Sequence, residues 1–430
     1  MRLSLAQGLA LRSLCLSCMS SIVRGADFDG LGDLEAPGAL AAAARLLANT
    51  HNELVVLATG PDATSIQMVN NTLVSLEGVG LRRHTLLLAD SWTTCRALLA
   101  PPCWWSSRTL RKPPSDSRTM TMFWDWRFRF YFIKKLYIAS LVRHGFAVLQ
   151  ADTDTVWVHD PFPMLRAMQG SSIIAMKDTA LANAGVVYAR PGSAAAQRLL
   201  DDVAWRVQLF QNWPEVVPEI VPFAKPPYYA NSDDQTLLND AIVSAVTGNR
   251  TFLGSTARYE AKNRYNPDGP AWDSTAESHI WRRQLSKMYK RQRSRTVTVP
   301  WDSRSTRYAI LPLHGANDSV ALAPRALFAH LPYDPRNAVT HLTAARGFKA
   351  KVSTLQKIGM WNPNGLPKGA EGTPPASSDE HHKGPTRKGA GAKGGAAKGG
   401  AAKGGAAKGG AAKGGAKKRW SGRPSDAPEE

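Results

Sequence analysis

Two acidic residues, Asp152 and Asp154, have the spacing in this chain that most directly predicts chemistry. They follow the apolar segment 146–150, which predicts a buried strand after the helix-stopping Gly145. Residues two apart on an extended chain point to the same side, so both carboxylates face one way where the strand ends. Mg²⁺ and Mn²⁺ are commonly held by carboxylates and substrate phosphates, and open α/β sheets bind ligands at the carboxyl ends of strands. The pattern therefore predicts a metal site for a nucleotide diphosphate, with a solvent-exposed turn as the alternative.

The chain before this pair predicts a β-α-β unit that helps to position it. Residues 54–59 and 86–89 form short continuous apolar runs, which are typical of strands buried on both faces. Between them, residues 64–79 carry apolar side chains at helical spacing. Thr59 and Asp90 stand at the two strand ends, where they either contact a nucleotide or cap the following loops.

The segment between this unit and the acidic pair contains a loop and a helix. Residues 91–119 are rich in Pro, Ser and Trp and predict a long loop. Residues 120–144 predict a helix with a core stripe and a charged outer face; a nucleic-acid surface of rings and basic side chains is the alternative. The predicted stripe consists of Ile133, Leu136, Tyr137, Ser140 and Leu141, and the predicted outer face carries Arg127, Arg129, Lys134 and Lys135.

Polar residues at the ends of later elements are further candidates. Asn183 and Gly185 precede a predicted strand, where a glycine lets the backbone approach a ligand and an amide can bond sugar hydroxyls. Asp234 and Gln235 lie at the start of a predicted helix. There a carboxylate either caps the helix or orients a donor sugar and stabilises positive charge at its anomeric carbon. The remaining predicted elements are strands at 173–176, 186–189, 297–299 and 308–313 and helices at 34–50, 193–210 and 231–243.

These motifs occur in the order found in nucleotide-diphospho-sugar transferases of glycosyltransferase family 77, which the chain resembles over residues 50–361. The family pattern Gly-x-x-Val-Leu-x-x-Asp-x-Asp-x-x-Trp followed by Asp-Pro is similar to residues 145–161. Asn-x-Gly, Asp-Gln followed by Leu-Asn, and a late His with Gly, Lys and Gly-x-Trp complete the resemblance. The late residues are His341, Gly347, Lys349 or Lys351, and Gly359 to Trp361; the family often has Asn where this chain has Thr343.

The resemblance implies a GT-A-like α/β fold with a mostly parallel central sheet flanked by helices. It implies that Asp152, Asp154 and His341 bind Mn²⁺ (or Mg²⁺) and that Asp234 is the catalytic carboxylate. The implied reaction moves a sugar from a nucleotide-diphospho-sugar donor, a UDP-sugar, to a glycan or hydroxyproline-rich glycoprotein acceptor, with retention of configuration. The donor-binding residues, with the two strand-end residues included, are Thr59, Asp90, Asn183, Gly185, Gln235, Lys349 and Lys351.

The two ends of the chain have a different composition. Residues 1–26 predict a secretory leader or a poor signal-anchor, so the Golgi lumen or Golgi membrane is the expected location. Residues 364–430 carry 13 Lys/Arg, 6 Asp/Glu and several GGAAK repeats. This composition predicts a disordered basic tail with weak, nonspecific affinity for polyanions.

Cysteines and sequons add two expectations. Cys95 and Cys103 form a disulfide if the chain is lumenal and stay free otherwise. The sequons at Asn70, Asn249 and Asn317 are compatible with the secretory route. Two other functions remain open: a polyanion-binding protein that acts through its tail, and a sugar-nucleotide-binding module without turnover.

Overall fold

The computed structural model of the chain describes residues 31–98, 103–110, 126–178, 182–212, 216–220, 234–252, 287–288, 290–343, 345 and 347–364. These residues belong to one compact unit, Met1–Thr373. The predicted leader and all of the predicted tail beyond Asn364 lie outside the described residues.

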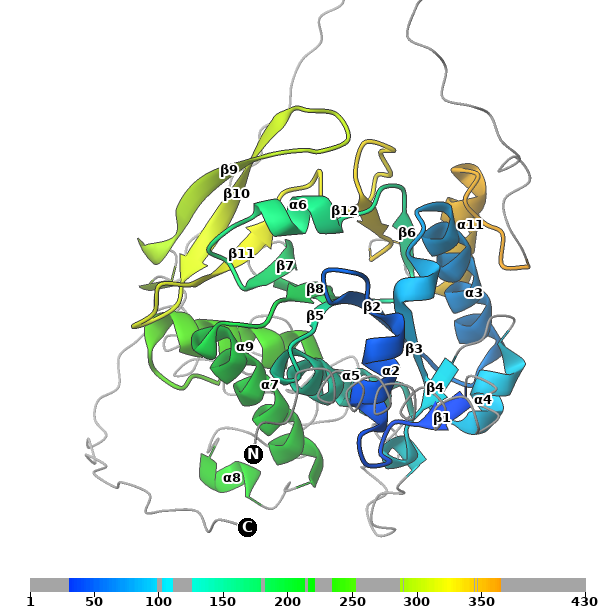
Figure 1. Cartoon of the computed structure of the whole chain (residues 1–430), viewed down its shortest axis with the longest axis horizontal. Helices are drawn as coiled ribbons and strands as arrows, with labels where there is room; N and C mark the ends of the chain where they lie inside the picture. Colours follow the sequence, from blue (N-terminus) through cyan, green and yellow to red (C-terminus); the bar gives the residue numbers. More distant parts are fainter. Residues whose placement is uncertain are drawn as a thin grey trace, which may run out of the picture. The chain divides into compact units, whose positions relative to one another are not determined.

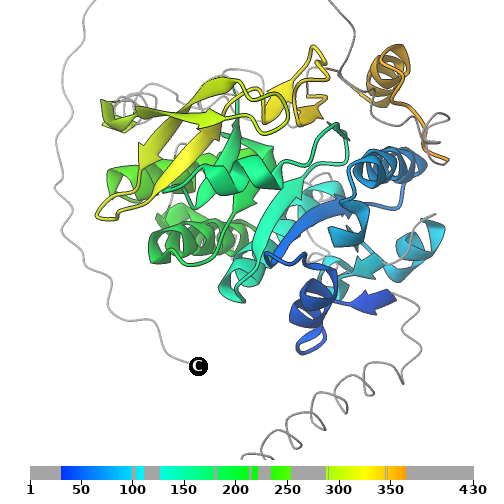
Figure 2. The same cartoon turned by 45° about the horizontal axis from the view of Figure 1, so that its top comes forward.

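A ten-stranded sheet forms the centre of this unit (Figure 1). Pairing of neighbouring strands shows that eight of the ten strands run the same way, and that β8 and β10 alone are opposed. The predicted mostly parallel α/β sheet is therefore confirmed. In spatial order the strands are β1 (Leu31–Asp33), β4 (Cys103–Trp105), β3 (Thr85–Ala89), β2 (Glu53–Thr59), β5 (Ala147–Ala151), β8 (Ala182–Ala189), β7 (Ile173–Lys177), β11 (Ser319–Ala323), β10 (Ser305–Pro312) and β9 (Arg293–Thr298). Figure 2 shows the sheet running from β1 (dark blue) to the β9–β10 hairpin (yellow-green).

Helices cover both faces of the sheet, which explains why its central strands are continuous apolar runs. One apolar core lies under α2 (Ala39–Leu47), α5 (Trp126–Arg143), α7 (Ala194–Asn212) and α9 (Asp234–Thr247). The other lies under α3 (Ala63–Gly78), α4 (Trp92–Ala97) and α6 (Phe162–Ala167). Strands β2, β3 and β5 are buried along their whole length. In the part of the chain that the structure describes, no helix has the length and apolarity to cross a bilayer.

A second, three-stranded sheet brings the late part of the chain to the acidic pair. Its order is β12 (Phe328–His330), β13 (Val339–His341) and β6 (Thr155–Trp157), and α11 (Phe348–Lys357) follows it. Strands β13 and β6 are antiparallel, and His341 lies opposite Thr155. The pairing places the late histidine directly beside Asp154.

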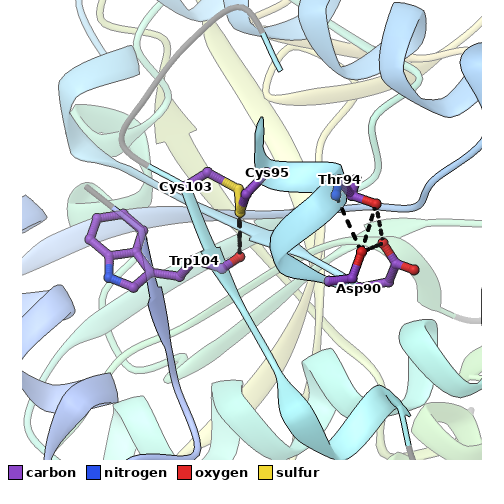
Figure 3. Close-up of a disulfide and its surroundings, with 6 residues drawn as sticks. Asp90, Thr94, Cys95, Cys103 and Trp104 are labelled. Carbon is purple, nitrogen blue, oxygen red and sulfur yellow. Dashed lines mark hydrogen bonds between the residues drawn. A yellow bond between two sulfur atoms is a disulfide. The ribbon is translucent and has the colours of Figure 1, made fainter. Parts of the chain in front are cut away.

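The prediction of a long loop over residues 91–119 is wrong. It contains α4, β4 and the 3₁₀ helix Ser107–Leu110, and β4 extends the parallel sheet between β3 and β1. Cys95 and Cys103 form a disulfide that joins α4 to β4 (Figure 3). The Pro and Ser content of this segment predicted a loop. The short elements form nevertheless, because the disulfide and the sheet hold them where local propensity does not.

One smaller prediction also changes. The strand expected at 186–189 begins at Ala182, so Asn183 and Gly185 lie within β8 rather than in a turn before it. Its pairing with β7 shifts register between Ala175 and Met176. Of the sequons, Asn70 is 7% exposed on α3, whereas Asn249 and Asn317 are exposed.

Candidate metal and donor site

Asp152 and Asp154 follow β5 at the carboxyl edge of the sheet, and His341 ends β13. The His341 Nε2 atom lies 3.1 Å from Asp154 Oδ1 and 3.7 Å from Asp152 Oδ2. One ligand atom from each residue falls within 4.8 Å of the others. The structure thus brings together the three predicted metal ligands from segments nearly 190 residues apart in sequence, as the 187-residue separation of Asp154 and His341 shows.

Backbone contacts hold this turn in place. The Asp152 amide donates to the Gly185 carbonyl at 2.7 Å, and the Leu342 amide donates to the Asp154 carbonyl at 3.0 Å. The Thr72 hydroxyl on α3 donates to the Thr153 carbonyl. The acidic turn is therefore fixed from β8, from β13 and from α3 at once.

Gly185 leaves room for two of the three ligands, His341 and Asp152. A Cβ atom at this position would lie 2.3 Å from His341 Cε1, 2.6 Å from Asp152 Oδ2 and 2.8 Å from Asn183 Oδ1. The predicted close approach at Gly185 is therefore made to the metal ligands themselves. Two carboxylates and one imidazole gathered in this way form a donor set that suits a divalent cation such as Mn²⁺, so the residues present fit the implied metal.

Two lysines of α5 reach this site and were predicted wrongly to lie on the outer face of the helix. Lys134 is 1% exposed, and its Nζ lies 2.6 Å from Asp152 Oδ1. Lys135 is 5% exposed, and its Nζ donates to Gln150 Oε1 at 2.7 Å and to the Ala184 carbonyl at 3.0 Å. The same ammonium lies 3.5 Å from Asp234 Oδ2. Charged groups are buried here because each has a partner of opposite charge.

Of the two late lysines, Lys351 is the one that the structure places at the acidic pair. Its Nζ lies 2.6 Å from Asp154 Oδ2. Lys349 is exposed on α11, and no ion pair among the described residues joins it to the acidic pair. Thr343, where the family often has Asn, bonds His330 Nδ1 at 2.6 Å; the His330 ring stacks on His341 with centroids 6.4 Å apart.

Asp234 and Gln235 are the first two residues of α9, and Gln235 contacts Asn183. Gln235 Nε2 donates to Asp178 Oδ2 at 2.8 Å, and Asn183 Nδ2 donates to Gln235 Oε1 at 3.4 Å. Asn183 Oδ1 accepts from the Gly185 amide at 2.8 Å. The Asn183 amide therefore stabilises the strand that carries Gly185.

The two strand-end candidates differ in their surroundings. Thr59 ends β2 and is 2% exposed, and its hydroxyl has no hydrogen-bond partner among the described residues. Asp90 accepts from Thr94 Oγ1 at 2.6 Å at the start of α4 (Figure 3). Burial raises the pKa of the Asp90 carboxyl, and the bonds from Thr94 and Ser91 oppose that rise. Ser91 is the residue that caps α4, since its side chain accepts from the Thr94 amide, so a donor contact by Asp90 stays a prediction.

Charge pairing sets the protonation of the centre. Burial acts to raise the pKa of Asp154, but the His341 imidazole and the Lys351 ammonium outweigh it and hold this pKa below its usual range. Burial acts to lower the pKa of His341, and the Asp154 carboxylate outweighs it, so this pKa is raised. Burial lowers the pKa of Lys135 to about 8, although the Asp234 carboxylate opposes the shift.

A family model matches the part of the chain that contains the acidic pair. Residues 99–261 match the family model described as nucleotide-diphospho-sugar transferase. This segment includes the acidic pair, Asn183 and Asp234 but ends before His341. No curated protein matches the chain in sequence.

Several solved glycosyltransferase structures are among those similar to this chain. The apo form of GlyE from Streptococcus pneumoniae TIGR4 is 17% identical with a TM-score of 0.25, covering 44% of this chain and 43% of that one. A second GlyE structure is 14% identical with a TM-score of 0.27, covering 56% of this chain and 64% of that one. Mouse xyloside xylosyltransferase 1 in its apo form is 9% identical with a TM-score of 0.26, covering 68% of this chain and 98% of that one. The chain thus spans about half the length of the two GlyE structures.

The family match does not distinguish glycosyltransferase family 77 from related families, so that finer assignment stays a prediction. At the level of the family model the resemblance is supported: the segment of this chain that carries the Asp-x-Asp pair matches the nucleotide-diphospho-sugar transferase model over residues 99–261.

Proposed function

We propose that this protein is a metal-dependent glycosyltransferase that moves a sugar from a UDP-sugar to a glycan or glycoprotein acceptor. The observation that carries the proposal is the group of Asp152, Asp154 and His341, whose ligand atoms lie within 4.8 Å of one another. This group stands at the carboxyl edge of a mostly parallel sheet, where such sheets bind nucleotides. The family match over residues 99–261 supports the same chemistry.

The charges of the site suit a diphosphate. Asp152, Asp154 and Asp234 contribute three negative charges, and Lys134, Lys135 and Lys351 contribute three positive ones, so the side chains sum to zero. A divalent cation held by the two carboxylates and His341 adds two positive charges. The diphosphate of a nucleotide sugar carries two negative charges. The two positive charges of the cation balance them, because the side chains contribute no net charge.

The leaving group is the point at which these residues act. The cation, when bound, acts as a Lewis acid toward the leaving diphosphate. The ammonium groups of Lys134 and Lys351 lie 2.6 Å from the carboxylates that would hold the cation, and there they would stabilise the negative charge that grows on the leaving group as the sugar–phosphate bond breaks. These donors are held by ion pairs to the metal carboxylates, so little reorganisation is needed during the reaction.

The sugar is expected beside the start of α9. Lys135 fixes the Asp234 carboxylate through the contact at 3.5 Å, and this carboxylate is the one we assign to stabilising the oxocarbenium-like centre. We propose front-face transfer with retention, in which the leaving phosphate assists the acceptor hydroxyl. A glycosyl-enzyme trapped on Asp234 would contradict this part of the proposal.

Release of UDP is the direct test. The full chain is incubated with a panel of UDP-sugars and Mn²⁺, and compared with the Asp152→Asn/Asp154→Asn variant. Asp201→Asn is the matched control, since Asp201 is a half-exposed carboxylate on α7 that pairs with Arg143. We expect release that needs the metal, survives in the control and is lost in the double variant.

Other results of this experiment would favour one of the two alternative functions. Binding of UDP-sugar without release would favour a binding module without turnover. Absence of both, with polyanion binding lost on deletion of 364–430, would favour a protein that acts through its basic tail. The polyanion affinity of the tail is otherwise a minor property.

We also propose that the protein works in the secretory pathway, in the Golgi lumen or at the Golgi membrane, on a hydroxyproline-rich glycoprotein or cell-wall glycan. The disulfide between Cys95 and Cys103 supports an oxidising compartment. Localisation of a tagged full chain tests this, and a cytosolic signal would contradict it.

A further inference from the structure

Each metal carboxylate has two oxygens in different surroundings. The inner oxygens, Asp152 Oδ2 and Asp154 Oδ1, face His341 Nε2 at 3.7 and 3.1 Å. The outer oxygens, Asp152 Oδ1 and Asp154 Oδ2, each lie 2.6 Å from a lysine ammonium. The lysines are Lys134 on the core side and Lys351 on the side of α11. Both outer oxygens are thus already paired with a cation before a metal ion arrives.

This arrangement is unfavourable for a bare divalent cation. The affinity of an oxygen site for such an ion falls as the negative charge of its ligands falls. Here the two carboxylates are balanced by two ammonium groups, one of them 1% exposed and poorly screened by water. A metal ion bound alone would stand beside two like charges at close range. Lys135 lies behind the site, where the Asp234 carboxylate at 3.5 Å offsets its charge.

We propose that this site takes its metal as a complex with the donor diphosphate and rejects the bare ion, and that Lys134 and Lys351 impose this selection. The inference rests on the proposed function, because it assumes that the ligand is a diphosphate. With the complex, the phosphate oxygens face the two ammonium groups and remove their repulsion toward the metal. The same lysines therefore weaken binding of the ion alone and strengthen binding of the ion with diphosphate.

A purely positioning role for the lysines predicts a different result. If the ammonium groups only orient the carboxylates, their removal weakens metal binding in both states. If they select the complex, their removal strengthens binding of the bare ion and weakens binding of the complex. The sign of the change for Mn²⁺ alone separates the two roles.

The experiment uses the full chain and two probes, Mn²⁺ alone and UDP in the presence of saturating Mn²⁺. Free Mn²⁺ is measured by electron paramagnetic resonance, and UDP binding by calorimetry. The variants are Lys351→Met and Lys134→Met, with Lys357→Met as a matched control on an exposed turn of α11. The Asp152→Asn/Asp154→Asn variant gives the background from the basic tail.

We expect Lys351→Met to bind Mn²⁺ alone about tenfold more tightly and UDP with Mn²⁺ about tenfold more weakly, an estimate from charge pairs at this range. Lys134→Met changes both affinities in the same directions, and Lys357→Met changes neither. The Lys351 side chain is 27% exposed, so its variant tests the proposal even where the buried Lys134→Met variant fails to fold. Weaker or unchanged binding of Mn²⁺ alone in Lys351→Met would overturn the proposal.

Failure of the proposed function gives a different pattern. If the unmodified chain binds no UDP at saturating Mn²⁺, the nucleotide-sugar assignment is wrong. The arm with Mn²⁺ alone then still shows whether the lysines repel the bare ion. If UDP binds but the two variants lose affinity for both probes, the nucleotide-binding assignment of the site stands and the selection is wrong.

Discussion

Gly185→Ala is the substitution that tests the geometry of the site most directly. The added methyl group would lie 2.3 Å from His341 Cε1 and 2.6 Å from Asp152 Oδ2, whereas Cβ contacts essentially never fall below 3.0 Å. His341 must therefore recede by at least 0.7 Å (3.0 − 2.3), or the β8 backbone must move away by a similar distance. Ligand distances in a working metal site hold to about 0.2 Å, so the expected displacement exceeds what the site tolerates.

Two measurable consequences follow for this variant. Overpacking at a buried position costs about 1 to 3 kcal/mol of unfolding free energy, and loss of ligand geometry should weaken binding of Mn²⁺ with UDP by about 10- to 100-fold. Urea unfolding and calorimetry measure these effects separately. The matched control is Gly78→Ala at the end of α3, where an added Cβ meets nothing within 4 Å. Unchanged stability and unchanged UDP affinity in Gly185→Ala would refute the assignment of Gly185 to the site.

Three further predictions address single features. Since burial lowers the pKa of Lys135 to about 8 from 10.5, the unfolded chain binds more protons between these values. Stability from this group therefore rises with pH across that window, and urea titrations at pH 7.5 and 10 should show a smaller rise in Lys135→Met; an equal rise would contradict the shift. Thr59→Val should leave unfolding free energy equal or higher by up to about 1 kcal/mol, since the hydroxyl is buried without a described partner, while UDP affinity falls several-fold; lower stability with unchanged UDP affinity would argue against donor contact. Replacing Cys95 and Cys103 by Ala should cost about 2 to 3 kcal/mol in urea unfolding, and reduced unmodified protein should behave alike; equal stability of oxidised and reduced protein would contradict this.

The acidic pair could be predicted from the sequence because its evidence is local. A continuous apolar run identifies a strand buried on both faces, and the residues that follow it fall at the carboxyl edge of the sheet. Spacing of two residues then places Asp152 and Asp154 together without any knowledge of distant contacts. The β-α-β unit that contains Thr59 was predictable for the same reason.

Lys134 and Lys135 were missed because α5 does not have one apolar face. Ile133 and Tyr137 form the predicted stripe, but Ile138 and Val142 are buried on an adjacent side of the helix. From Phe132 to Arg143 every side chain except Leu136, Ser140 and Arg143 is buried. Lysines at positions 134 and 135 therefore have no outer face to occupy and need carboxylate or carbonyl partners. The sequence feature that predicts this burial is the presence of apolar residues on more than one side of the helix. A search for one apolar stripe does not detect it.

His341 required a different kind of information. Nothing in the local sequence distinguishes it from a histidine that ends an ordinary strand, and only the resemblance to a family assigned it. The structure supplies the physical reason in the register of a small sheet, where β13 runs antiparallel to β6 and sets His341 opposite Thr155. A shift of that pairing by one residue would turn the imidazole to the other face of the sheet and leave the two carboxylates without a third ligand. The metal site therefore depends on the pairing of two strands whose residues Asp154 and His341 are 187 positions apart in sequence. The spacing of residues within a motif does not predict the register of such a pairing.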